Sequence, residues 1–61
     1  MTRPEILRKL LRLEPMEPLH TLHVCGWPVE EFDAALRTAI AHGWVRLVKG
    51  GNQHTTRLEA A

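Results

Sequence analysis

The fold is decided by residues 18–49, which read PLHTLHVCGWPVEEFDAALRTAIAHGWVRLVK. Apolar residues recur at helical spacing on both sides of a Cys25-Gly26-Trp27-Pro28 corner, and this pattern predicts helices over about residues 18–25 and 28–42. A glycine without a β-carbon suits the tight turn between the helices, and a proline suits the start of the second one. The segment therefore predicts two short helices that meet at a sharp corner.

The residues that follow the second of these helices have the pattern of a β-hairpin. Gly43 is a helix stop, and the alternating apolar residues of 44–49 predict a strand with Val45 and Leu47 on one face. The Gly50-Gly51-Asn52-Gln53 segment predicts a turn, because glycine and asparagine tolerate positive φ. Residues 54–59 then predict the returning strand. The hairpin is expected over about residues 44–59.

A further helix is predicted before the corner, over about residues 3–14. Thr2 and Glu5 have the spacing of a capping box, and Glu14-Pro15 ends the helix because a residue before proline avoids the α region. Residues 15–18 then form an extended connector, which is long enough for a short edge strand. The first helix carries an apolar arc of Ile6, Leu7, Leu10, Leu11 and Leu13.

The spacing of apolar residues predicts a buried row of side chains on the second helix and another on the third. We expect the second to bury Leu19, Leu22 and Cys25, and the third Val29, Phe32, Ala35, Leu36, Ala39 and Ile40.

Length and composition predict one small domain over residues 1–61. The sequence is 44% hydrophobic and 25% charged, with a net charge of +1. Those are values of an ordinary globular protein, so any contact with nucleic acid must rely on local clusters of charge. A single cysteine cannot form an internal disulfide, and charges interrupt every apolar run near the N-terminus. We expect a cytoplasmic protein with no membrane span.

The whole pattern resembles a winged helix-turn-helix domain. The resemblance covers nearly everything from Glu5 to Glu59, and it is carried by Leu22, Gly26, Val29, Phe32, Leu36, the 40–45 segment IAHGWV and the Gly50-Gly51-Asn52 turn. It implies an α+β fold of three helices with a C-terminal β-hairpin wing. It also implies that the third helix enters the DNA major groove and that the wing touches the flanking DNA. By position it nominates Glu30, Asp33, Ala34 and Arg37 on the helix, and Lys49, Asn52, Gln53, His54 and Arg57 on the wing.

The charges on the third helix depart from what DNA binding favours. The helix carries three carboxylates, Glu30, Glu31 and Asp33, but only one cation, Arg37. Phosphates repel carboxylates. Near the start of a helix, however, carboxylates stabilise the helix dipole, and a carboxylate can also accept from cytosine N4. On the hairpin, by contrast, three cations exceed one carboxylate.

Other chemistry has less support in the sequence. His20, His23 and Cys25 are metal-ligand types, but a zinc site needs a fourth ligand, and Cys25 is more simply explained as a small apolar residue packed in the turn. The sequence has neither serine nor tyrosine, and no residue is placed to activate the lone cysteine. We therefore expect no metal, no cofactor and no enzymatic activity.

The leading prediction is sequence-selective binding of double-stranded DNA by a small transcriptional or mobile-element regulator that acts as a homodimer. The arc of leucines on the first helix is the preferred surface for self-association, although Leu13 is equally well placed to end the core row. The alternative is a protein-interaction module whose acidic third helix binds a protein partner.

Overall fold

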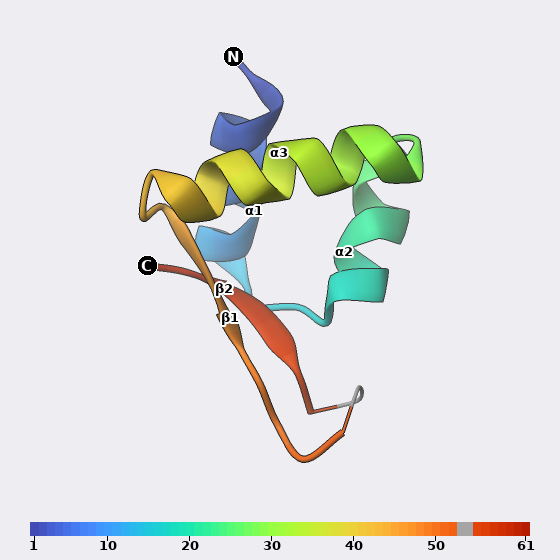
Figure 1. Ribbon diagram of the computed structural model, residues 1–61, viewed down its shortest axis with the longest axis vertical. Helices are drawn as coiled ribbons and strands as arrows, with labels where there is room; N and C mark the ends of the chain where they lie inside the picture. Colours follow the sequence, from blue (N-terminus) through green and yellow to red (C-terminus); the bar gives the residue numbers. More distant parts are fainter. Residues whose placement is uncertain (53–54) are drawn as a thin grey trace.

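The computed structural model describes residues 1–52 and 55–61. Three helices are followed by an antiparallel pair of strands, as Figure 1 shows. This order confirms the expected α+β architecture, and it is compatible with a small winged-helix-like fold. The elements are α1 (Arg3–Leu13), α2 (Pro18–Cys25), α3 (Val29–Ala41), β1 (Val45–Val48) and β2 (Arg57–Ala60). The third helix is one residue shorter at each end than the pattern predicts, and the returning strand begins at residue 57 where 54 was expected.

Polar groups at the start of α1 fix where the helix begins. The backbone N–H and the hydroxyl of Thr2 both donate to Glu5 Oε1, at 3.3 and 2.8 Å, so the expected capping-box pair is present. Two hydrogen bonds lower the pKa of Glu5. The one from the Thr2 hydroxyl has the larger effect, and the one from the Thr2 N–H comes second. The carboxylate form of Glu5 is thus the form that this helix start favours.

Two glycines with positive φ set the direction of the backbone at the ends of α2 and α3. Gly26 has a φ of 68° and donates its N–H to the Leu22 carbonyl at 3.0 Å, which closes α2. Gly43 has a φ of 74°, and the Trp44 N–H behind it donates to the Ala39 carbonyl at 3.0 Å. Both positions are in the left-handed region that glycine tolerates without strain.

The strand β2 lies in the middle of the sheet, because the connector before α2 also pairs with it. Val45 is opposite Ala60 and Leu47 is opposite Leu58 in the β1–β2 register. On the other side, Met16 and Leu58 exchange backbone hydrogen bonds of 3.0 and 2.6 Å. The expected edge strand in the connector is therefore a single bridge. It joins the segment between α1 and α2 to the hairpin.

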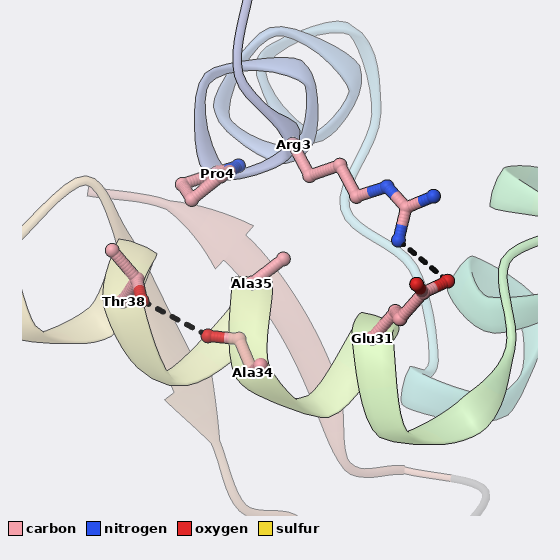
Figure 2. Close-up of a pocket in the computed structure, with 6 residues that line it drawn as sticks. All are labelled: Arg3, Pro4, Glu31, Ala34, Ala35 and Thr38. Atoms are coloured by element: carbon pink, nitrogen blue, oxygen red, sulfur yellow. Dashed lines mark hydrogen bonds and ion pairs between the residues drawn. The ribbon is translucent and has the colours of Figure 1, made fainter.

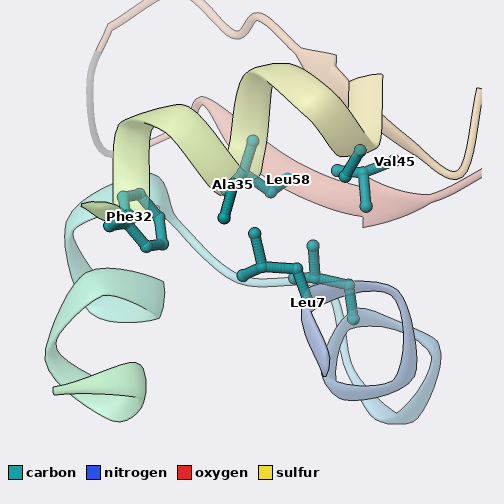
Figure 3. Close-up of a cluster of buried hydrophobic side chains, with 7 residues drawn as sticks. Leu7, Phe32, Ala35, Val45 and Leu58 are labelled. Carbon is teal, nitrogen blue, oxygen red and sulfur yellow. The ribbon is translucent and has the colours of Figure 1, made fainter. Parts of the chain in front are cut away.

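The core lies between α1, α3 and the inner face of the hairpin, as Figure 3 shows. Leu7 of α1, Ala35 of α3 and Leu58 of β2 approach one another there. Among the residues described, the buried apolar side chains all come from these elements, so the hairpin is part of the core. They are Leu7, Leu11, Phe32, Ala35, Ala39, Val45 and Leu58.

The predicted row on α2 was wrong at one position. Leu19 is 64% exposed, whereas Thr21 is fully buried. The Thr21 hydroxyl donates to the Glu17 carbonyl at 2.8 Å, and this hydrogen bond offsets the cost of removing its polar atom from water. A small threonine thus takes the inward position that apolarity alone assigns to leucine.

The predicted row on α3 was also too wide. Val29 is 62% exposed and Ile40 is 42% exposed. At 3.6 residues per turn, both point roughly a quarter turn away from the row formed by Phe32, Ala35 and Ala39. The described elements pack against that row and leave this flank of α3 to solvent.

Candidate nucleic-acid interface

The outer face of α3 presents the four predicted helix residues together. Glu30, Ala34 and Arg37 point away from the buried row, and Asp33 lies beside them one turn from Arg37. All four side chains are exposed. We call Glu30, Asp33, Ala34, Arg37 and Ala41 the outer face of α3. Ala34 borders α1 at one edge of this face, and the described elements leave the rest of the face to solvent.

An ion pair neutralises the single cation of that face. Arg37 Nε lies 3.0 Å from Asp33 Oδ2, and the side chains are 80% and 53% exposed. The residues are four apart, so the helix itself brings them to the same side. The pair offsets the charge of one of the three carboxylates of α3, which are Glu30, Glu31 and Asp33.

A second carboxylate is offset by a residue of α1 that the sequence pattern did not nominate. Arg3 Nη1 lies 2.8 Å from Glu31 Oε2, and the Arg3 guanidinium also stacks over the Trp27 ring at 5.0 Å from its centroid. Figure 2 shows the ion pair at one end of a shallow groove between α1 and α3. The groove has a volume of about 390 Å³ and is also lined by Pro4, Ala34, Ala35 and Thr38. Glu31 therefore faces α1, which leaves Glu30 as the carboxylate of the outer face without an ion pair in the part of the protein described.

Two predicted wing cations lie at the turn end of the hairpin. Arg57 is opposite Val48 in the register, and Lys49 follows Val48 directly. Both side chains are exposed, and neither forms an ion pair with any residue in the ranges 1–52 and 55–61. The third cation, Arg46, is paired with Glu59 at 2.7 Å. The positive charge available to a partner is thus concentrated toward the turn of the hairpin.

The turn of the hairpin is held by threonine hydroxyls. The Asn52 carbonyl accepts from the N–H groups of Thr55 and Thr56, both at 3.1 Å, and from their hydroxyls at 3.1 and 3.0 Å. The Asn52 N–H donates to Thr55 Oγ1 at 3.1 Å, and Gly50 N–H donates to Thr56 Oγ1 at 3.3 Å. A β-carbon at Gly50 would overlap the Thr55 side chain. These contacts join Gly50 and Asn52 to the two threonines at the start of the returning segment.

Two of the predicted wing residues, Gln53 and His54, lie outside the described residues. The remaining ones are placed in two sets: Glu30, Asp33, Ala34 and Arg37 share α3, whereas Lys49, Asn52 and Arg57 share the hairpin. Within the described ranges, no ion pair joins the two sets. Their relative position depends on the core that connects α3 to the hairpin.

An aromatic stack braces the junction between α3 and β1. The His42 and Trp44 rings are stacked at 4.5 Å with an interplanar angle of 17°, and the Arg8 guanidinium lies 5.3 Å from the Trp44 centroid. Arg8 Nε is buried and has no hydrogen-bond partner among the described residues. Trp44 is half-buried, so its ring joins α1 to the start of the hairpin and is not a free apolar patch.

The histidines and the cysteine of α2 do not assemble with other ligands. His20 and His23 are exposed, whereas Cys25 is half-buried, and burial raises the pKa of its thiol. Within residues 1–52 and 55–61, no three His, Cys, Asp or Glu side chains are grouped so that they hold a metal ion. Nor do these residues include a helix with the length and apolarity needed to cross a membrane.

The apolar arc of α1 is divided between the core and solvent. Leu7 and Leu11 are buried and Leu10 is half-buried, whereas Leu13 is 85% exposed. Ile6, seven residues before Leu13 on the same side of the helix, is also exposed. The arc is therefore wider than the core that α1 covers.

Comparison with known proteins gave no match to a family model, a curated protein or a solved structure.

Proposed function

We propose that this protein is a small winged helix-turn-helix protein that binds double-stranded DNA with sequence selectivity. In this proposal α3 enters the major groove, and the turn of the hairpin contacts the neighbouring sugar-phosphate backbone. The observation that supports it best is the combination of an uncovered outer face on α3 with Lys49 and Arg57 on the hairpin, which form no ion pair with a described residue. Phosphate contacts supply most of the affinity in such complexes, and base contacts supply the selectivity.

The acidic residues of α3 are compatible with this role. Glu30 and Glu31 lie in the first turn of the helix, where carboxylates stabilise the helix dipole. Glu31 is tied to Arg3 at 2.8 Å, and Asp33 is tied to Arg37 at 3.0 Å. The electrostatic repulsion between α3 and DNA phosphates is therefore smaller than the sequence alone suggests.

We further propose that the protein acts as a homodimer in the cytoplasm, as a regulator of transcription or of a mobile element. A single small module presents only about 600–1,000 Å² to DNA, and pairing two copies doubles this area and reads two half-sites. The exposed Ile6 and Leu13 on α1 support self-association through that helix. Alanine at both positions should lower the apparent mass in light scattering from that of a dimer to that of a monomer.

The test is duplex binding measured over a series of salt concentrations. If the hairpin contacts phosphates, Lys49→Ala and Arg57→Ala should each reduce the slope of log affinity against log salt by about 1. Lys9→Ala is the matched control, because Lys9 is exposed on α1 on the side opposite the buried Leu7 and Leu11. This variant should keep the slope of the unaltered protein. Undetectable binding of any duplex at low salt would refute the proposal.

A second function is favoured by one observation, the exposed apolar flank of α3. Val29 directly precedes Glu30, and Ile40 lies on the same flank about three turns further along. A surface of apolar and acidic residues suits a protein with a basic, apolar groove. In this case the domain is an interaction module. Val29→Asp and Ile40→Asp would then abolish capture of the protein partner, and the unaltered protein would bind no duplex.

A further inference from the structure

We propose that Arg37, held in place by Asp33, reads a guanine in the major groove. The inference rests on the proposed DNA-binding function and adds to it the base that α3 selects and the residue that positions the reader. It assigns Arg37 the base contact and Asp33 the role of a positioning residue.

The geometry of the ion pair leaves the right donors free. Arginine has five N–H donors in a planar fork, and in this pair Asp33 Oδ2 lies 3.0 Å from Nε. Neither terminal nitrogen, Nη1 or Nη2, forms a hydrogen bond within residues 1–52 and 55–61, so both can donate to a partner. Two parallel donors of this kind match the O6 and N7 acceptors that guanine presents in the major groove, which is the commonest specific contact between an arginine and a base.

The place of Arg37 on α3 suits that contact. Its side chain is 80% exposed and points away from the buried row of the helix. Ala34 and Ala41, one turn before and one turn after it on the outer face, are both exposed and have the smallest side chains that a helix favours. The helix backbone can therefore approach the base edges closely near Arg37.

The charge of the pair explains why an acidic residue is useful in this place. Because Asp33 offsets the charge of Arg37, the pair gains little from the general attraction to phosphates. What remains is a planar set of donors on a guanidinium that the ion pair restrains, which favours a base with two matching acceptors over a mobile phosphate contact. Asp33 thus lowers the overall affinity for DNA and raises the preference for guanine over the other bases.

An exposed pair four residues apart also occurs simply as a support of the helix. The structural role and the positioning role predict different effects of Asp33→Ala. A merely structural pair predicts a small loss of stability and an equal change of affinity for every duplex. A positioned reader predicts tighter binding to random duplexes, since a carboxylate is removed, together with a loss of preference for guanine.

The first part of the test uses duplexes enriched by selection from a random pool with the whole protein. We expect the enriched sequences to share a G·C pair, at which 7-deazaguanine, which lacks N7, weakens binding by roughly 5- to 150-fold. Inosine at the same place keeps O6 and N7 and should bind like guanine. Arg37→Ala should remove the dependence on N7. Arg57→Ala is the matched control, which should weaken binding to all duplexes while the preference for guanine remains.

The second part compares Asp33→Ala with Asp33→Asn. An asparagine keeps a polar oxygen on the side chain next to Arg37, although it carries no charge. Both variants should bind random duplexes more tightly, but only Asp33→Asn should keep most of the preference for guanine. The inference is overturned if the protein binds duplexes but no position needs guanine N7, or if the two variants prefer guanine to the same degree. In either case the proposed function still stands. If no duplex binds at all, the proposed function fails, and the inference fails with it.

Discussion

Replacing Leu58 by alanine should destabilise the protein more than any other change on the hairpin. Leu58 is fully buried in the middle strand, between β1 on one side and the Met16 bridge on the other. Its side chain packs in the core with Leu7 and Leu11 of α1 and with Val45 of β1. If the hairpin completes the core, removal of this side chain leaves a cavity that so small a protein cannot fill.

The expected loss is a large part of the total stability. A buried Leu→Ala change costs about 2–5 kcal/mol, which includes the cavity that it leaves. At roughly 0.05–0.15 kcal/mol per residue, a 61-residue domain has a free energy of unfolding of only about 3–9 kcal/mol. We therefore expect Leu58→Ala to lower the melting temperature by at least about 8 °C.

The natural control is Leu47, which is directly opposite Leu58 in the register but 43% exposed. Leu47→Ala removes the same atoms and should cost about 1 kcal/mol or less, because it deletes less buried surface and opens no enclosed cavity. Urea unfolding followed by tryptophan fluorescence measures both variants, since Trp44 adjoins the core. Equal losses in the two variants would refute the reasoning, because they would place β2 outside the core.

Three further outcomes follow from the turns and from the first helix. Gly43→Val should cost about 1–2 kcal/mol in thermal unfolding, because Gly43 has a φ of 74°, and an unchanged melting temperature would count against the helix-to-hairpin junction. Gly50→Ala should weaken the hairpin, whereas Gly51→Ala should not, because a β-carbon at Gly50 meets Thr55 and one at Gly51 meets nothing within 4 Å; amide hydrogen exchange of β1 and β2 distinguishes the two. Glu5→Gln should reduce stability at neutral pH and have little effect at acid pH. The lowered pKa of Glu5 means that its contribution is present above its ordinary pKa and is lost as the pH falls through the lowered value, so an equal effect at both pH values would contradict the account.

Proline and glycine made the boundaries of the elements predictable from the sequence. Pro18 begins α2, Gly26 ends it, and Gly43 follows the end of α3, each through a local restriction of the backbone. The side that each helix buries was harder to predict. The apolar Leu19 is exposed and the polar Thr21 is buried, since the interior accepts a hydroxyl that bonds to its own helix.

The positions of the nominated residues on α3 were predictable from spacing, but the contacts between different elements were not. Spacing alone places Glu30, Ala34 and Arg37 on one side of α3, and four-residue spacing also brings Asp33 to Arg37. The ion pair between Arg3 and Glu31 joins two elements that no local pattern connects, so it needed the tertiary structure. The bridge that ties the connector to β2 has the same origin.

Mapping of the bound surface by backbone amide chemical shifts tests the central claim most directly. A labelled sample titrated with a duplex at low salt should show its largest shifts on the outer face of α3, around Asp33 and Arg37, and on the hairpin around Lys49 and Arg57. The exposed side of α1 around Lys9 should remain unchanged. Shifts confined to α1 or α2, or a spectrum that does not change with DNA, would contradict the account.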